Sequence, residues 1–146
     1  MEMSTETSKQ EANKQIVVEH FRLMSEARFL DALKDFAPDA EWWVIGHGVH
    51  GGSNSMQDLI AAYSGPVPQY FPNGNPINLT LLVAEGDWVV AEGVGQGPVI
   101  TGAGKPYQNQ YVWLFKIVDG KVRIFKEYFD TLHAEERIFG RKLVDG

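Results

Sequence analysis

One carboxylate stands among apolar residues in the clearest hairpin that the sequence predicts. Glu127 belongs to the run 121–130, which follows the dipeptide Asp119-Gly120 and the run 107–118. Asp-Gly between two β-branched and aromatic runs is a strong hairpin signal, because a type I′ turn needs a positive φ at both central residues. Burial among apolar side chains raises the pKa of a carboxyl group and suits it to proton transfer. Glu127 is therefore the candidate catalytic acid/base.

The turn also predicts which residues share a face with Glu127. If Asp119 and Gly120 are the whole loop, each residue of one strand has a defined partner on the other. The predicted pairs on the Glu127 face are Val112–Glu127, Leu114–Phe125 and Gln110–Phe129. We expect these apolar residues to pack a ligand, and Gln110 to orient it or to satisfy the carboxylate.

The opposite face of the same hairpin is too apolar for solvent. In the predicted register it carries Tyr111, Trp113, Phe115 and Tyr128. If helices cover the Glu127 face, this outer face still needs a partner. The sequence therefore predicts a homodimer through the outer sheet face.

Further polar residues have plainer interpretations. His47 and His50 lie three residues apart in a glycine-rich turn. A metal site would need a third ligand, so two solvated loop histidines are favoured and no metal is expected. If that turn lines a pocket, His47 could exchange protons near neutral pH. Asp130 is expected to pair with Asn109 as a polar clamp that caps a following helix.

The predicted strand 88–96 contains two glycines, Gly93 and Gly95. Gly93 and Gly95 do not fit a dinucleotide fingerprint, because no helix follows them. We expect the two missing side chains to widen a cavity, with Glu92 on the outer face.

The elements that must position these residues follow from periodicity and turn signals. Helices are predicted at 10–26, around 29–36, after a cap at Ser53 or Asn54, and at 131–139. Strands are predicted at 41–45, 77–84 and 88–96, before the hairpin. The proline-rich connection 65–76 is a possible lid. Apolar residues of the helices, including Phe21 and Ile60, and the strand residues Trp42 and Val44 complete the expected ligand-binding wall.

Composition excludes several classes of function. The chain has 146 residues, a formal net charge of −6 and no cysteine. An acidic chain does not bind nucleic acid or an anionic membrane by electrostatics, and without cysteine there is no disulfide or thiolate site. We expect residues 1–9 to be a disordered tail and 10–146 a single domain. Without a signal segment or a long apolar run, a soluble cytoplasmic protein is expected.

The order of these elements resembles the nuclear transport factor 2-like superfamily, and within it the SnoaL-like and ketosteroid-isomerase-like proteins. The matching stretches are FAPDAEW at 36–42, WVVAE at 88–92, and the hairpin motif from Tyr107-x-Asn109-x-Tyr111 to Glu127-Tyr128-Phe129-Asp130. The resemblance runs from about Ile16 to about Leu132. It implies an α+β, cone-shaped domain whose curved antiparallel sheet wraps around about three N-terminal helices, and a homodimer.

The resemblance implies the same acid but not the same partners. An acid seven residues after the turn glycine is the position used by limonene epoxide hydrolases, and Glu127 occupies it. Their arginine and second aspartate match Gly93 and Gly95. The ketosteroid isomerase base and tyrosine match Val44 and Phe21, and its protonated aspartate (a worked example in general accounts of pKa tuning) matches about Val112. We therefore expect neither of those two activities.

Three hypotheses remain open. The first is a cofactor-independent acid/base enzyme, of isomerase, cyclase or dehydratase/hydrolase type, that acts on a small hydrophobic oxygenated molecule. The second is a non-catalytic protein that binds such a molecule. The third is a dimerisation module whose pocket is filled by its own side chains, since this fold hosts many functions.

Overall fold

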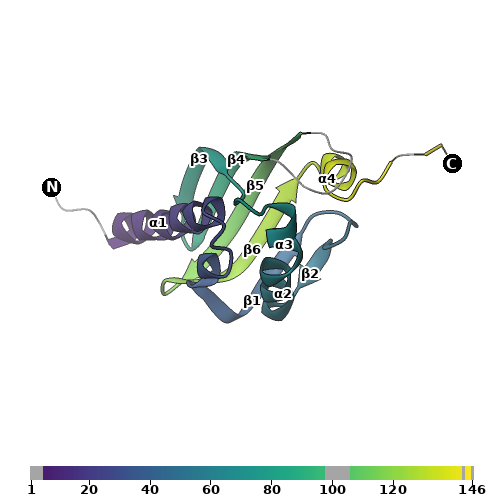
Figure 1. Cartoon of the computed structure of the whole chain (residues 1–146). Coiled ribbons are helices and arrows are strands. Elements are labelled where there is room, and N and C mark those ends of the chain that lie inside the picture. Colours follow the sequence, from purple (N-terminus) through teal and green to yellow (C-terminus); the bar gives the residue numbers. More distant parts are fainter. Residues whose placement is uncertain (1–4, 98–105, 143, 146) are drawn as a thin grey trace.

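The computed structural model describes residues 5–97, 106–142 and 144–145, and its centre is a single six-stranded sheet. The strand order across the sheet is β2-β1-β6-β5-β4-β3 (Figure 1). The strands are β1 (Phe36–Val44), β2 (Gly52–Asn54), β3 (Ile77–Glu85), β4 (Trp88–Gly97), β5 (Tyr107–Val118) and β6 (Lys121–Phe129). The helices are α1 (Thr5–Ser25), α2 (Met56–Ser64), α3 (Pro66–Tyr70) and α4 (Thr131–Arg137), with a 3₁₀ turn η1 (Asp31–Leu33). The predicted α+β class is confirmed.

The helices α1, α2 and α3 lie over one face of the sheet, and the core fills the space between them (Figure 1). Alternate residues of the strands point into this core, as a half-buried sheet requires. On β5 the alternation is complete, from buried Tyr107 to buried Ile117. From α1 the apolar side chains Val17 and Phe21 meet the sheet, and the Phe21 ring lies 4.4 Å from that of Trp113.

The sheet is mixed, whereas the sequence predicted an antiparallel one. β1 pairs in parallel with β6, so that Trp42 is opposite Phe125 and Val44 is opposite Glu127. The chain reaches this arrangement because α2, α3 and four strands lie between the two partners and carry it back in the same direction. β1 also begins at Phe36, and the predicted helix around 29–36 contracts to the turn η1.

The hairpin register departs from prediction by one residue. Next to the turn, Ile117 pairs with Val122 as expected, but the next pair is Lys116 with Ile124. Arg123 is thus an extra residue on β6, a β-bulge that the turn dipeptide does not reveal. Side chains alternate with period two, so a shift of one residue in the pairing changes which β5 residues share a face with Glu127. Beyond the bulge, the β5 residues predicted on the outer face lie on the Glu127 face, and those predicted on the Glu127 face lie on the outer one.

The bulge corrects the predicted faces of β5. Tyr111, Trp113 and Phe115 are buried in the core rather than on the outer face. Conversely, the predicted ligand-packing residues Val112, Leu114 and Gln110 alternate to the outer face. Only the assignments on β6 survive, because Phe125, Glu127 and Phe129 lie beyond the bulge on one strand and keep their mutual alternation.

The N-terminal helix is longer than predicted. α1 begins at Thr5, so residues 5–9, expected to belong to a disordered tail, are helical, whereas residues 1–4 lie outside the described residues. An ion pair between Lys9 and Asp87 in the β3–β4 turn ties this first part of the helix to the sheet. α2 is capped by Ser55 rather than Ser53 or Asn54, in a capping box with Asp58.

The proline-rich connection 65–76 packs against the core instead of forming a loose loop. It contains α3, and its Phe71 side chain is buried. Gly74 has a φ of +99°, and a side chain there would meet the carbonyl oxygen of Ser25. The connection is therefore fitted to the end of α1. Among the described residues, no helix combines the length and the apolar character needed to cross a membrane.

Candidate functional site

Glu127 occupies the centre of the concave face, between two indole rings. The Nε1–H of Trp42 donates to one carboxylate oxygen at 2.9 Å, and the Nε1–H of Trp113 donates to the other at 3.2 Å. Both contacts follow from the sheet, because β1 and β5 flank β6 and Trp113 is directly opposite Glu127. The carboxylate is thus held in a fixed orientation by two rigid donors.

Two opposing effects set the ionisation of Glu127. Burial among aromatic residues raises the pKa of its carboxyl group, while the hydrogen bonds from Trp42 and Trp113 lower it. Burial outweighs the two hydrogen bonds, so that the pKa stays above its usual value. A carboxyl group in this balance can both take and return a proton.

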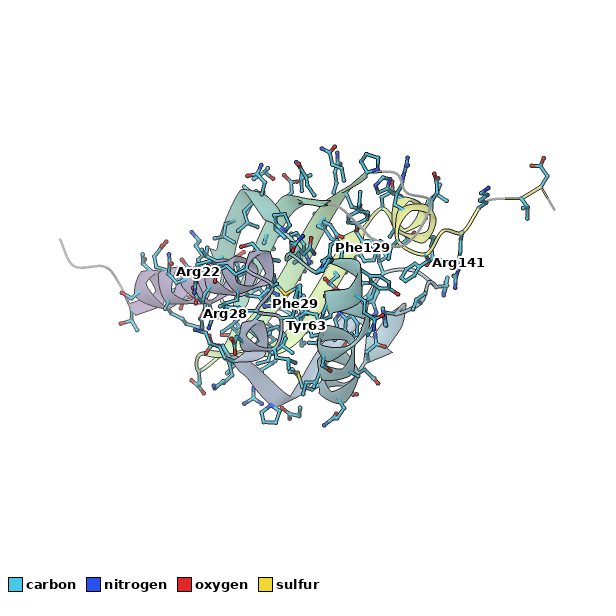
Figure 2. All side chains as sticks on the ribbon, viewed as in Figure 1. Arg22, Arg28, Phe29, Tyr63, Phe129 and Arg141 are labelled. Atoms are coloured by element: carbon cyan, nitrogen blue, oxygen red, sulfur yellow. The ribbon has the colours of Figure 1, made fainter. Side chains whose placement is uncertain are left out.

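An outer pocket of about 140 Å³ opens beside Glu127. Its wall comes from the sheet, from α2 and α3, from the loop after β1 and from α4. Figure 2 marks two lining residues, Tyr63 on α2 and Phe129 at the end of β6. Typical ligand pockets begin near 300 Å³, whereas a cavity of about 150 Å³ is enough for benzene. The outer pocket suits a single ring, or part of a larger molecule that extends through its mouth.

Phenol groups of Tyr63, Tyr70, Tyr107 and Tyr111 are among the polar groups that line this wall besides Glu127. The hydroxyl groups of Tyr107 and Tyr111 are hydrogen-bonded to each other, and Asn109 Nδ2 donates to Tyr107 Oη at 3.2 Å. Burial raises the pKa of Tyr107 to about 12 and that of Tyr111 and Tyr63 well above the usual value. All three phenols therefore stay protonated and can act as hydrogen-bond donors.

Asn109 has an orientation fixed by the backbone. Its Oδ1 accepts from the backbone N–H of Asp130 at 3.0 Å, and its Nδ2 donates to the Asp130 carbonyl oxygen at 2.9 Å. The Asp130 side chain accepts from His133 N and caps α4. The predicted polar clamp and helix cap are confirmed.

A smaller inner chamber of about 50 Å³ lies behind Glu127. Buried His20 of α1 is part of its wall, with Nδ1 2.9 Å from the carbonyl oxygen of Ala32. A carbonyl only accepts, so Nδ1 carries the hydrogen and Nε2 keeps a lone pair. Burial lowers the pKa of His20 to about 4, which keeps its ring neutral at physiological pH.

The structure brings together six of the eleven site residues predicted from the sequence. Those that line the outer pocket or the inner chamber are Glu127, Trp42, Val44, Phe129, Phe21 and Phe125. The others lie elsewhere: Gln110, Val112 and Leu114 on the outer sheet face, Ile60 exposed on α2, and His47 exposed in its loop. Of the two loop histidines it is His50 that lines the outer pocket, with its ring tilted by 39° against the Trp42 ring and the two centroids 5.1 Å apart.

Several site residues were not predicted. The sequence placed Trp113 and Tyr111 on the outer face and gave Tyr107 no face. The reason is that the bulge at Arg123 leaves no signal in the turn residues. Asn75 and His20 sit in a connection and on a helix, where sequence alone does not show which way a polar side chain points.

The two glycines of β4 have a role opposite to the one predicted. A side chain at Gly95 would come within 2.8 Å of the Tyr111 ring, and one at Gly93 would meet Asn78 and Ile77. The space they leave is thus occupied by neighbouring residues, and the Tyr111 ring lies against the strand. Glu92 lies on the outer face as predicted, where Thr80 donates to it at 2.9 Å.

A model of the SnoaL-like domain matches residues 17–124, which is most of the chain. The chain belongs to the SnoaL-like family. The resemblance to SnoaL-like and nuclear transport factor 2-like proteins is therefore confirmed, and the helices and curved open sheet are those of that fold. No curated protein matches the chain.

Solved structures share this SnoaL-like fold at low identity. A putative SnoaL-like polyketide cyclase from Jannaschia sp. has a TM-score of 0.74 at 18% identity, and the match covers 97% of this chain and 99% of that one. TerC, crystallised with polyporic acid, has a TM-score of 0.72 at 22% identity, over 88% and 98% of the chains. A protein of unknown function from Burkholderia pseudomallei has a TM-score of 0.73 at 21% identity, over 87% and 97%.

Proposed function

We propose that this SnoaL-like protein is a cofactor-independent acid/base enzyme that isomerises, cyclises, dehydrates or hydrolyses a small hydrophobic oxygenated molecule. The observation that carries the proposal is Glu127, a desolvated carboxylate clamped by Trp42 and Trp113 at the wall of an apolar pocket. Each carboxylate oxygen keeps a second lone-pair direction beyond the indole bond, and this is the position from which a base removes a proton.

Tyr111 is the proposed partner of Glu127. Asn109 Nδ2 donates to Tyr107, and either phenol can donate in the Tyr107–Tyr111 hydrogen bond; in the proposed arrangement Tyr107 donates to Tyr111. The hydroxyl hydrogen of Tyr111 is then left for the ligand. While Glu127 takes a proton from a carbon next to a carbonyl group, Tyr111 can donate to the carbonyl oxygen as it gains negative charge.

The pocket and the comparisons support an oxygen-bearing, largely apolar ligand. Its wall is aromatic and aliphatic, and the protonated phenols offer donors to a carbonyl or hydroxyl oxygen. Proteins of the same fold include a putative polyketide cyclase and one crystallised with polyporic acid. We therefore place aromatic or quinone-like polyketides, rather than charged metabolites, first among the substrates to screen.

The test compares Glu127→Gln with Glu92→Gln, which removes the same charge from the outer face. Thermal-shift screening of the wild type against steroids, terpenoid epoxides and polyketide aromatics identifies a ligand, and turnover of that ligand is then followed. We expect Glu127→Gln to lower turnover by about 10²–10⁴-fold while the ligand affinity stays within about tenfold, or 1.4 kcal/mol. Glu92→Gln should match the wild type. Equal turnover by wild type and Glu127→Gln contradicts the proposal.

A binding protein without catalysis is the second candidate, because both carboxylate oxygens of Glu127 already accept a hydrogen bond. A carboxylate satisfied in this way can be a structural or ligand-orienting group. This function requires a ligand that stabilises the wild type and is recovered unchanged after long incubation with it.

We also propose that the protein forms a homodimer through the outer sheet face. The bulge changes the residues of this face, which now include Val112 and Leu114 on β5 and the half-exposed Leu81 and Val83 on β3. Apolar residues on neighbouring strands favour a self-complementary contact. Sedimentation velocity should give a dimer for the wild type and a monomer for Leu114→Glu. A monomeric wild type at micromolar concentration contradicts this proposal.

A further inference from the structure

The inner chamber is continuous in its wall with the outer pocket but differs from it in size and polarity. The two spaces share Met24, Tyr63, Asn75, Tyr111 and Glu127. At about 50 Å³ the chamber is far smaller than the cavity of about 150 Å³ that holds benzene, so it is too small for a ring. One or two water molecules fit, because each occupies about 30 Å³ in the liquid.

Asn75 gives this chamber an unsatisfied polar atom. Its Oδ1 is buried and has no hydrogen-bond partner among the described residues. The backbone prevents an easy escape of the side chain, because Asn75 N donates to the Met24 carbonyl oxygen at 2.9 Å and Gly74 fixes the preceding turn. Turning the amide over would place its NH₂ group at the same buried position, which also needs a partner.

His20 adds an acceptor to the same space. Its Nδ1–H is committed to Ala32, and the ring is enclosed by aromatic residues, among them Phe21 and Phe125, which also line the chamber. The Nε2 lone pair of the neutral ring is therefore available to a donor in the chamber. With the Glu127 carboxylate and Asn75 Oδ1, the wall presents three kinds of acceptor, and water can donate to two of them at once.

We propose that the inner chamber is a water-binding site formed by Asn75, His20 and Glu127, and that Asn75 is a positioning residue for Glu127. The assignment of Glu127 as the acid/base rests on the proposed function, whereas the water site itself does not. A ligand in the outer pocket covers one side of the carboxylate. Water in the chamber then remains as a hydrogen-bond donor on the other side and keeps the ionised form available.

The experiment reads the water and the carboxyl group directly and needs no substrate. A high-resolution crystal structure of the wild type shows whether the chamber holds ordered density within hydrogen-bond distance of Asn75 and Glu127. In parallel, the pKa of Glu127 is measured by ¹³C NMR titration in the wild type, in Asn75→Leu and in Asn73→Leu. Asn73 is an exposed residue of the same connection and serves as the matched control.

We expect water density in the wild type and a higher Glu127 pKa in Asn75→Leu. An apolar side chain of similar size removes the acceptor that holds the water, and a Glu127 that is about tenfold weaker as an acid corresponds to one pKa unit. Asn73→Leu should titrate like the wild type. A chamber that is dry or filled by side chains overturns the proposal, as does an unchanged Glu127 pKa in a folded Asn75→Leu.

The two proposals fail separately. If Asn75→Leu does not fold, the wild-type density decides the question of the water site alone. If water is present but Glu127→Gln leaves turnover intact, the acid/base function falls and the water site stands. If Glu127→Gln loses turnover while the chamber is dry, the acid/base function is supported and the water site is excluded.

Discussion

Two adjacent residues of β6 carry opposite charges to opposite faces of the sheet, and two aromatic side chains hold each of them. On the concave face, Glu127 accepts hydrogen bonds from the ring edges of Trp42 and Trp113. On the outer face, Lys126 lies over the ring faces of Trp43 and Tyr128, at 4.6 Å and 5.5 Å from the centroids. Carboxylates meet the positive edge of an aromatic ring, and ammonium groups meet its negative face.

The two groups differ in the effect of their surroundings. Lys126 is half-buried on the outer face, and contacts of an ammonium group with aromatic rings outside a core contribute only about 0.5–1 kcal/mol. Glu127 has exchanged most of its water for two indole donors, and the pKa of its carboxyl group rises as a result. Contacts with two aromatic side chains thus accompany a minor stabilisation on one face and a shifted carboxyl pKa on the other.

The largest expected effect comes from removing one aromatic residue from each face. Trp113→Ala deletes a fully buried indole and leaves Glu127 with one donor, so we expect a loss of about 3–5 kcal/mol in the free energy of unfolding. Trp43→Ala, on the outer face, should cost about 1 kcal/mol at protein concentrations low enough to keep the protein monomeric. Urea denaturation of the two variants measures both values. Similar losses would mean that the two faces are equally buried, as in a tight dimer.

A pH series sharpens the comparison for the buried face. The pKa of His20 falls from 6.5 in the unfolded chain to about 4 in the folded one. Between these two pH values the His20 ring is protonated in the unfolded chain but neutral in the folded one. Stability is therefore lost as the pH falls, by about 3 kcal/mol between pH 7 and pH 4. His20→Phe should remove this loss. The check is urea denaturation of wild type and variant at pH 7, 5.5 and 4, and parallel profiles would contradict the expected effect.

The smallest expected effect is that of Lys126→Met. Loss of the ammonium group over Trp43 and Tyr128 should lower the free energy of unfolding by about 0.5–1 kcal/mol in the monomer. A markedly larger loss that depends on protein concentration would show that a second subunit covers Lys126. Urea denaturation at two concentrations a hundredfold apart distinguishes the two cases.

Features that depend on residues close together in the chain could be predicted from the sequence, whereas features that depend on strand pairing could not. Glu127, the hairpin turn and the Asp130 cap were predictable, because each depends on residues next to it in the chain. The partners of Glu127 were only half predictable. Trp42 was placed correctly, but Trp113 was turned to the wrong face by a bulge at Arg123 that changes the pairing without any glycine or proline to mark it.

Other features were decided by tertiary contacts. The connection 65–76 contains four prolines and looked irregular, yet it packs Phe71 into the core and aims Asn75 at the chamber. Gly93 and Gly95 were recognised as special positions, but only the packing of Ile77 and Tyr111 shows what their missing side chains make room for.

The parallel pairing of β1 with β6 also sets the order in which the site can be made. Trp42 and Glu127 are 85 residues apart in the chain, and contacts between such distant residues form late because the loop between them must first be closed. During synthesis Trp42 leaves the ribosome long before Glu127 does. Until β6 docks between β1 and β5, one edge of each of these two strands has no hydrogen-bond partner, and open strand edges make a folding chain prone to aggregate.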